Sequence, residues 1–295
     1  MLIGEIAALI TAVLWSGSAI AFSEASKQIG SSLVNITRMV IGLFFLAITI
    51  LLLDINTNIS LNQYYYLIIS GIIGIAFGDA FLFKALEMIG ARISMLLMAV
   101  SPIIAAVLAF LFLGENISFW GVIGIIITFT GILLVLLQKS EATNRDKNSV
   151  VGIVFALLAA LGQGGGLIFA KLAFNNGEIN GFFATFIRLA AAFIVFYPIL
   201  RFSNRLNNPI EKLKKNKKGF VFSSIGAFIG PYLGITMSLI AVKHAYVGIA
   251  STLMSTVPVI MLPIVYFYYK EKLSLSSILG AFITVLGISV LFLKN

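Results

Sequence analysis

One acidic residue, Asp79, lies deep inside an apolar run, Tyr64–Leu86, that is long enough to cross a membrane as a helix. A carboxylate in such a position costs several kcal/mol, so by default it indicates a functional site. Asp79 could bind an ammonium group or a coupling proton. The structural alternative is an ion pair with Lys84 or Arg92. Lys84 follows Asp79 by five residues and lies about 140° away around a helix, so pairing within the helix is poor.

Two arginines and two glutamates lie in a matching pattern in other apolar runs. Arg38 and Arg188 lie in the first third of the second and seventh runs, and Glu115 and Glu271 end the fourth and ninth. If successive runs cross a membrane in alternate directions, each arginine shares a depth with the glutamate of the other half of the chain. The pattern predicts two ion-pair gates between the halves. Snorkelling of the arginines, or pairing within one half, would explain the same residues.

Two prolines, Pro102 and Pro258, lie in the middle of the fourth and ninth runs. A proline inside a helix cannot bond the carbonyl four residues earlier, so the carbonyls of Met98 and Met254 lose their usual donor. A pair of kinked helices can present this polar backbone to a central cavity and flex. A fixed kink, with the free carbonyls satisfied by serine hydroxyls, is the alternative.

Trp15 and Gln163 take equivalent positions in the first and sixth runs. Both side chains need hydrogen-bond partners in hydrocarbon, so they either line a ligand path or join neighbouring helices. The sequence therefore predicts a site in two parts. The ligand-binding residues are Trp15, Asp79, Met98, Gln163 and Met254, and the gating or kink residues are Pro102, Pro258, Arg38, Arg188, Glu115 and Glu271.

The composition indicates what kind of molecule holds these groups. Hydrophobic residues make up 60% of the 295 positions and charged residues only 11%, against about 25% charged in a soluble domain. Such a chain cannot cover a water-exposed surface, which excludes a soluble enzyme, a nucleic-acid-binding domain and a disordered protein. With no cysteine and one histidine, the sequence also predicts no disulfide, metal centre or cofactor.

Ten apolar runs follow one another, and each is long enough for a helix across about 30 Å of hydrocarbon. We therefore expect an all-α membrane protein with ten transmembrane helices. The runs are Ile3–Phe22, Leu33–Leu53, Tyr64–Leu86, Ile93–Leu113, Ile117–Leu137, Val150–Leu172, Gly181–Leu200, Phe220–Val242, Tyr246–Tyr268 and Leu275–Leu293.

The chain contains an internal repeat. Offsets of 148 and 150 residues align Trp15 with Gln163 and Arg38 with Arg188. An offset of 156 aligns three consecutive runs, as in the pairs Gly74 and Gly230, Pro102 and Pro258, Thr128 and Thr284, and Gly131 and Gly287. We expect two five-helix units, residues 1–138 and 150–295, joined by a linker at 139–149. Because five is odd, the units should cross the membrane in opposite directions, as is typical of secondary transporters.

Basic residues gather in the loops after the odd-numbered runs, most densely in Lys212–Lys218. The positive-inside rule then places these loops in the cytoplasm and both chain ends outside.

The two units resemble the EamA-type repeats of the drug/metabolite transporter superfamily over nearly the whole chain. The motifs that carry the resemblance are A-x-x-W-S at Ala12–Ser16, Arg38, Ala85–Leu86, Pro102, Gly114–Glu115, Gly121, Gly124 and Gly131, and in the second unit Arg188, Ala241, Pro258, Glu271, Gly280 and Gly287. Two positions depart from the pattern: Gln163 replaces the tryptophan, and Lys270 replaces the glycine before the glutamate. Some members of that superfamily have cytoplasmic ends, which conflicts with the loop charges.

The resemblance implies a secondary transporter of small metabolites, such as amino acids, in the cell membrane. We expect alternating access, and the partners to be a small-molecule substrate and membrane lipids, with no nucleic acid. The sequence leaves monomer and dimer open. A membrane-embedded lipid-modifying enzyme or a non-transporting scaffold is the alternative, but an enzyme would need clustered carboxylates or histidines.

Overall fold

The computed structural model describes residues 2–98, 100–136, 150–203, 208–268 and 274–294. Within these ranges the regular elements are helices, with no strand. They are α1 (Leu2–Ile29), α2 (Ser31–Leu52), α3 (Leu61–Gly71), the π-helix η1 (Ile72–Phe77), α4 (Gly78–Met98), α5 (Ser101–Leu113), α6 (Phe119–Leu136), α7 (Val150–Asn175), α8 (Gly181–Phe202), α9 (Pro209–Lys215), α10 (Lys217–Ala227), the π-helix η2 (Phe228–Gly234), α11 (Ile235–His244), α12 (Val247–Met254), α13 (Val257–Tyr268) and α14 (Leu275–Lys294).

Six helical stretches of the described chain are long and apolar enough to cross a membrane. They are Leu2–Ile29, Ser31–Leu52, Leu61–Leu82, Val150–Asn175, Gly181–Phe202 and Lys217–His244. Four shorter apolar helices cover Ser101–Leu113, Phe119–Leu134, Val247–Pro263 and Leu275–Val290. The predicted all-helical character with membrane-length helices is therefore confirmed, while four of the ten predicted runs form shorter helices.

Helix boundaries differ from the predicted runs at two kinds of place. The expected break between Leu86 and Ile93 is absent, and α4 continues to Met98. This segment has no proline and is rich in strong helix formers. Conversely, the run expected to end at Tyr268 is interrupted at Ser255 and Thr256, directly before α13.

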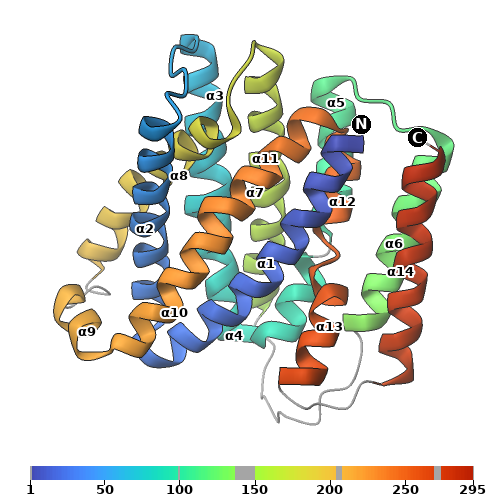
Figure 1. Ribbon diagram of the computed structural model, residues 1–295. Coiled ribbons are helices and arrows are strands. Elements are labelled where there is room, and N and C mark those ends of the chain that lie inside the picture. The colour runs from blue at the N-terminus through green and yellow to red at the C-terminus, as the bar shows by residue number, and fades with distance from the viewer. Residues whose placement is uncertain (1, 99, 137–149, 204–207, 269–273, 295) are drawn as a thin grey trace.

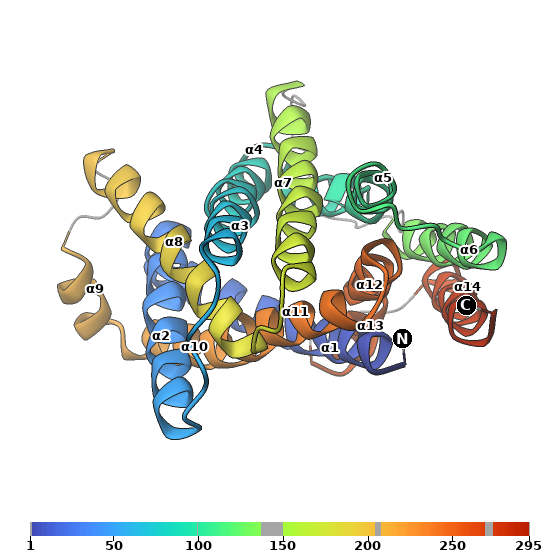
Figure 2. The ribbon, with the colours of Figure 1, turned by 90° about the horizontal axis from the view of Figure 1, so that it is seen from above.

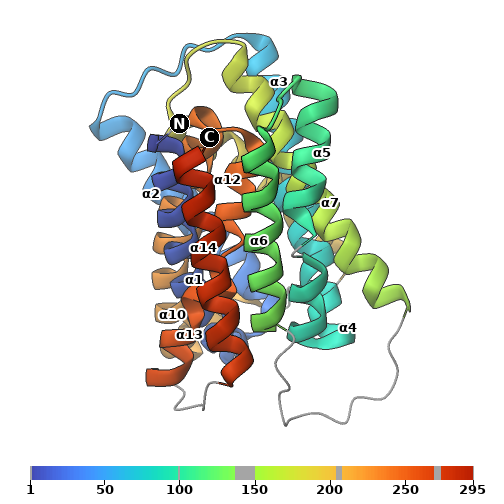
Figure 3. The same cartoon turned by 90° about the vertical axis from the view of Figure 1, so that its right-hand side faces the viewer.

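Both ends of the described chain lie at the same end of the bundle, near the N and C marks in Figure 1. We call this the terminal end, and the other the opposite end. Helix α1 starts at the terminal end, whereas α7 starts at the opposite end (Figures 1 and 3). The first helices of the two halves of the sequence therefore run in opposite directions.

The first helix of each half packs against helices of the other half, so the two halves exchange packing partners. Helix α1 packs on α10, η2 and α11, and α7 packs on α3, η1 and α4. Glycines permit the α7 contact: a Cβ at Gly166 would come within 2.8 Å of the Gly74 Cα, and one at Gly162 within 2.9 Å of the Gly78 Cα. Such backbone proximity is the usual role of small residues in membrane helices.

The last helix of each half packs against the last helix of the other. Figure 2 shows α6 and α14 side by side at one edge of the bundle, with α9 at the far edge. Gly131 of α6 faces Thr284 of α14, and Gly287 of α14 faces Thr128 of α6, with no room for a Cβ at either glycine. The pair is thus joined by two contacts related by the 156-residue offset.

The two largest apolar clusters of the described core join helices from both halves of the chain. The first joins α1, α5, α7, α11 and α12, with Leu253 and Met254 among its buried members. The second joins α1, α2, η1 and α8, with Met39, Leu46 and Leu189 fully buried. The polar site described next borders this second cluster.

Candidate functional site

Asp79 forms an ion pair with Arg38, which joins α4 to α2. The Arg38 Nη2 donates to Asp79 Oδ2, and its Nε donates to Asn35 Oδ1 over 2.8 Å. The guanidinium carbon also lies 5.6 Å from the centre of the Phe22 ring, within cation–π range. The side chains of Arg38 and Asp79 are 13% and 23% exposed, so the pair is largely shielded. The partner of Asp79 is therefore an arginine in the same half of the chain, a pairing that the sequence analysis left as an alternative for Arg38.

Arg188, on α8, lies close to the same carboxylate. The residue is 4% exposed, and Asp79 attracts its charge. Its guanidinium lies beside η1, since a Cβ at Gly74 would come within 3.3 Å of the Arg188 Nη2. Its Nε is buried and has no hydrogen-bond partner among the described residues. Two arginines from opposite halves thus lie near one aspartate, which forms its ion pair with Arg38.

Asp79 is placed by an irregular stretch of helix. It is the second residue after η1, whose six residues have π-helical geometry. The segment η2 starts at the equivalent position, 156 residues later. Short π-helical segments are rare and occur frequently at functional sites.

A cavity of 330 Å³ lies beside the ion pair, toward the opposite end. Asn35, which accepts the Arg38 hydrogen bond, and Ala80, which follows Asp79, both line it. Its other walls come from the start of α2, α4, α7 and the end of α8, and its polar lining includes Ser31, Ser32, Lys84 and Ser203. Arg38, Asp79 and Arg188 do not themselves line this cavity.

Trp15 and Gln163 lie at equivalent helix crossings. A Cβ at Gly234 would come within 2.7 Å of the Trp15 ring, and one at Gly78 would lie 3.6 Å from the Gln163 backbone nitrogen. Gly78 and Gly234 are related by the 156-residue offset, and Trp15 and Gln163 by the 148-residue offset. Neither residue lines the 330 Å³ cavity, so their place in a ligand path stays a prediction.

Each predicted proline kink is a break between two helices. Pro102 is in the first turn of α5, just after the turn at Val100, and Pro258 is the second residue of α13. Near the second break, Ser255 Oγ donates to the Ser251 carbonyl over 2.9 Å, and Thr256 Oγ1 donates to the Leu253 carbonyl over 2.7 Å. These hydroxyl groups bond the carbonyls of Ser251 and Leu253 rather than that of Met254, so the choice between a flexing and a fixed kink stays open.

The two methionines before these breaks differ in burial. Met254 ends α12 and is 2% exposed within the first apolar cluster. Met98 ends α4 and is half-buried. The position of Met254 is that of a core residue, and contact with a ligand stays a prediction for both.

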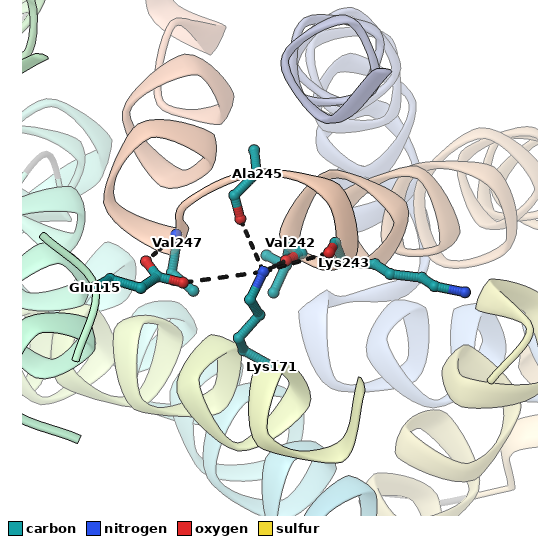
Figure 4. A network of polar contacts seen from close by, with 6 residues as sticks. All are labelled: Glu115, Lys171, Val242, Lys243, Ala245 and Val247. Carbon is teal, nitrogen blue, oxygen red and sulfur yellow. Dashed lines mark hydrogen bonds and ion pairs between the residues drawn. The ribbon is translucent and has the colours of Figure 1, made fainter. Parts of the chain in front are cut away.

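Glu115 and Lys171 form a second polar network, which ties three helices together (Figure 4). The Val247 backbone N–H, at the start of α12, donates to Glu115 Oε2 over 2.7 Å. The Lys171 Nζ donates to the carbonyls of Val242 and Ala245, over 2.7 and 3.0 Å, at the end of α11. It also lies 3.9 Å from Glu115 Oε1. Burial raises the pKa of the Glu115 carboxyl, while the Val247 N–H and the Lys171 charge oppose this shift.

This network replaces a predicted gate. Glu115 contacts Lys171 and Val247, and the structure does not pair it with Arg188. The second predicted gate cannot be followed, because Glu271 lies outside the described residues. Sequence reasoning did not select Lys171, although a lysine inside the apolar run Val150–Leu172 is the same kind of signal as Asp79.

No three His, Asp or Glu side chains of the described chain come together as a metal site would require. The chemistry that the arrangement supports is reversible binding of a polar group at the Arg38, Asp79 and Arg188 cluster.

Comparison with known proteins places the chain among membrane transporters. It matches the EamA-like transporter family over residues 2–137 and again over 150–293. An Archaeoglobus fulgidus protein named "Uncharacterized transporter" is 23% identical over 291 residues, which cover 97% of this chain and 96% of that protein. The "Uncharacterized transporter YdfC" of Bacillus subtilis is 27% identical over 229 residues, covering 76% and 70%. A solved structure titled "Crystal structure of protein" shares the fold, with a TM-score of 0.79, 16% identity, and coverage of 99% of this chain and 98% of that chain.

Proposed function

Because the chain belongs to the EamA-like transporter family, we propose that it is a secondary transporter that carries a small metabolite across the cell membrane by alternating access. The observation that carries this proposal is the buried cluster of Arg38, Asp79 and Arg188 beside a cavity of 330 Å³. Charged groups inside a membrane helix bundle are costly and typically mark a substrate or ion pathway.

We further propose ten membrane crossings in two inverted five-helix units. The four shorter apolar helices would complete crossings in combination with the helical segments next to them. The opposite directions of α1 and α7 support this arrangement. So do the symmetric contacts of Gly131 with Thr284 and of Gly287 with Thr128. Inverted repeats allow two related conformations that open alternately to the two sides.

The two polar features then take different parts in the cycle. The cavity lies toward the opposite end, where the basic helix α9 also lies and where the loop charges predict the cytoplasm. The Glu115 and Lys171 network joins α5 and α7 to the connection between α11 and α12 near the terminal end. In our proposal this network closes the terminal side, and it breaks when the substrate is released or taken up there.

Uptake by the purified protein in sealed vesicles tests the proposal. The vesicles would be given individually radiolabelled amino acids, small carboxylates, nucleosides and quaternary amines. At least one compound should accumulate or exchange, and Asp79→Asn should strongly reduce its flux. Glu211→Gln is the matched control, because Glu211 also pairs with a basic residue, Lys215, but at an exposed position. Folded protein that moves none of the compounds, or an Asp79→Asn variant with full flux, would refute the proposal.

A further inference from the structure

The buried charges of the candidate site do not balance. Two guanidinium groups, those of Arg38 and Arg188, lie close to the single carboxylate of Asp79. The described part of the site therefore carries at least one positive charge without a matching negative one.

The excess charge belongs to Arg188 rather than to Arg38. Arg38 already donates to Asp79 and to Asn35 and lies against the Phe22 ring. The Arg188 side chain has no hydrogen bond or ion pair among the described residues, and its buried Nε has no acceptor. Leaving a buried charged donor unpaired is strongly unfavourable, so such a group needs a partner that binds.

The surroundings of the buried Arg188 guanidinium are built partly from glycine backbone. Gly74 of η1 presents no side chain to the Arg188 Nη2, and Gly71 packs against the Arg188 carbonyl. Next to this, α7 contributes Gly166, which packs on Gly74. These contacts are tight and Arg188 does not line the 330 Å³ cavity, so a ligand reaches the guanidinium only when α8 moves relative to η1.

We propose that Arg188 binds the carboxylate of a monoanionic substrate in the membrane interior. This inference rests on the proposed transport function and names the substrate class. A guanidinium presents paired N–H donors that match the two oxygens of a carboxylate. A single negative charge neutralises the excess positive charge of the Arg38, Asp79 and Arg188 cluster. A zwitterion would leave that excess unchanged, and a cation would increase it.

Thermal unfolding of the purified full-length protein tests the binding step. The probes are sodium salts of acetate, propionate, pyruvate, lactate and benzoate, and the corresponding neutral amides, at constant ionic strength set with sodium chloride. We expect at least one carboxylate to raise the Tm by several degrees and its amide to have no effect. Arg188→Gln should abolish this shift, and Arg188→Lys should keep part of it. Arg201→Gln is the matched control, because Arg201 lies on the same helix but is exposed.

The ligand-free variants separate binding from a structural role. If Arg188 holds an unpaired charge, Arg188→Gln without ligand should unfold at the same temperature as the wild type or at a higher one. A lower Tm, together with a carboxylate shift that persists in Arg188→Gln, would overturn the proposal. Should Arg188→Gln fail to fold, an unchanged carboxylate shift in Arg188→Lys and in Gly74→Ala would overturn it. Failure of every carboxylate to stabilise the folded wild-type protein would also overturn it.

Vesicle uptake keeps the two proposals distinguishable. A carboxylate that stabilises the protein through Arg188 but does not cross the membrane supports the binding site and contradicts the transport function. Uptake of a cation or a neutral compound that is unaffected by Arg188→Gln supports transport and contradicts a carboxylate site at Arg188.

Discussion

The connection between α11 and α12 should depend on Glu115, because that carboxylate accepts the first N–H of α12. Replacing Glu115 with alanine removes the acceptor of the Val247 N–H, which lies 2.7 Å from Oε2. It also removes the negative charge 3.9 Å from the Lys171 Nζ. Lys171 keeps its bonds to the carbonyls of Val242 and Ala245.

The expected loss of unfolding free energy in Glu115→Ala follows from these contacts. Loss of a side-chain acceptor at a helix N-terminus costs about 1 kcal/mol. Loss of the partner of a buried cation costs about 3–5 kcal/mol when nothing else satisfies that cation. The carbonyl bonds of Lys171 reduce the second cost, as does relief of the buried Glu115 charge. We expect Glu115→Ala to lower the free energy of unfolding by about 2 kcal/mol, and Glu115→Gln, which keeps an acceptor, by about half as much.

Unfolding in mixed micelles of mild detergent and SDS, followed by tryptophan fluorescence, measures this loss. Glu178→Ala is the matched control, because Glu178 also bonds a lysine of α11, Lys243, but from an exposed position. The control should unfold with the wild type. If Glu115→Ala unfolds at the wild-type SDS fraction, the network does not hold the α11 and α12 connection, and our account of it is wrong.

Four further predictions follow from the same structure. Burial raises the pKa of Glu115 above 4.5, so the folded chain binds that proton more tightly than the unfolded chain. The stability from this group is then fully present below pH 4.5 and is lost as the pH rises through the raised pKa, and Glu115→Gln should flatten this decline in a pH series of unfolding. Asp79→Asn should leave two buried arginines without a counter-charge and lower the free energy of unfolding by about 3 kcal/mol. Adding Arg38→Gln to this variant should recover part of the lost stability. A further loss of stability in the double variant would refute the ion pair of Arg38 with Asp79. Pro102→Ala and Pro258→Ala should let α5 and α13 extend into the preceding breaks and slow vesicle flux with little change in Tm; full flux in both would show that the breaks are static. Reporter proteins fused within α9 and after residue 295 should report cytoplasmic and external locations respectively, and a cytoplasmic C-terminus would show that the loop charges mislead.

The repeat was predictable from sequence because it depends on small residues at constant offsets. Gly131 and Gly287, with their threonine partners, form a contact that an alignment of the halves already pairs. An irregularity at Pro102 and Pro258 was also predictable, because the missing N–H acts locally, but the sequence predicted kinks where the structure has breaks between helices. The break expected after Leu86 was wrong because helix propensity there outweighs the polar residues.

The partners of the charged residues were not predictable, because they depend on which helices become neighbours. The candidates for Asp79, Lys84 and Arg92, were taken from its own run and the segment directly after it, whereas the actual partner, Arg38, lies on α2. Depth alone paired Glu115 with Arg188, and the packing of α7 on α5 instead brings Lys171 to Glu115. Spacing within one chain fixes depth along a helix but not the order of helices around a bundle.

The exchange of packing partners between the halves also sets an order for biosynthesis. The face of α1 that carries Trp15 is covered by Gly234, which is synthesised 219 residues later. At about 5–20 residues per second, α1 waits roughly 10–40 s in the membrane before its partner emerges from the ribosome. During that interval the small and aromatic residues of α1 are exposed to lipid and to neighbouring proteins. A chain that stops early in the second half therefore leaves an unpaired surface, a substrate for membrane quality control rather than half of a working protein.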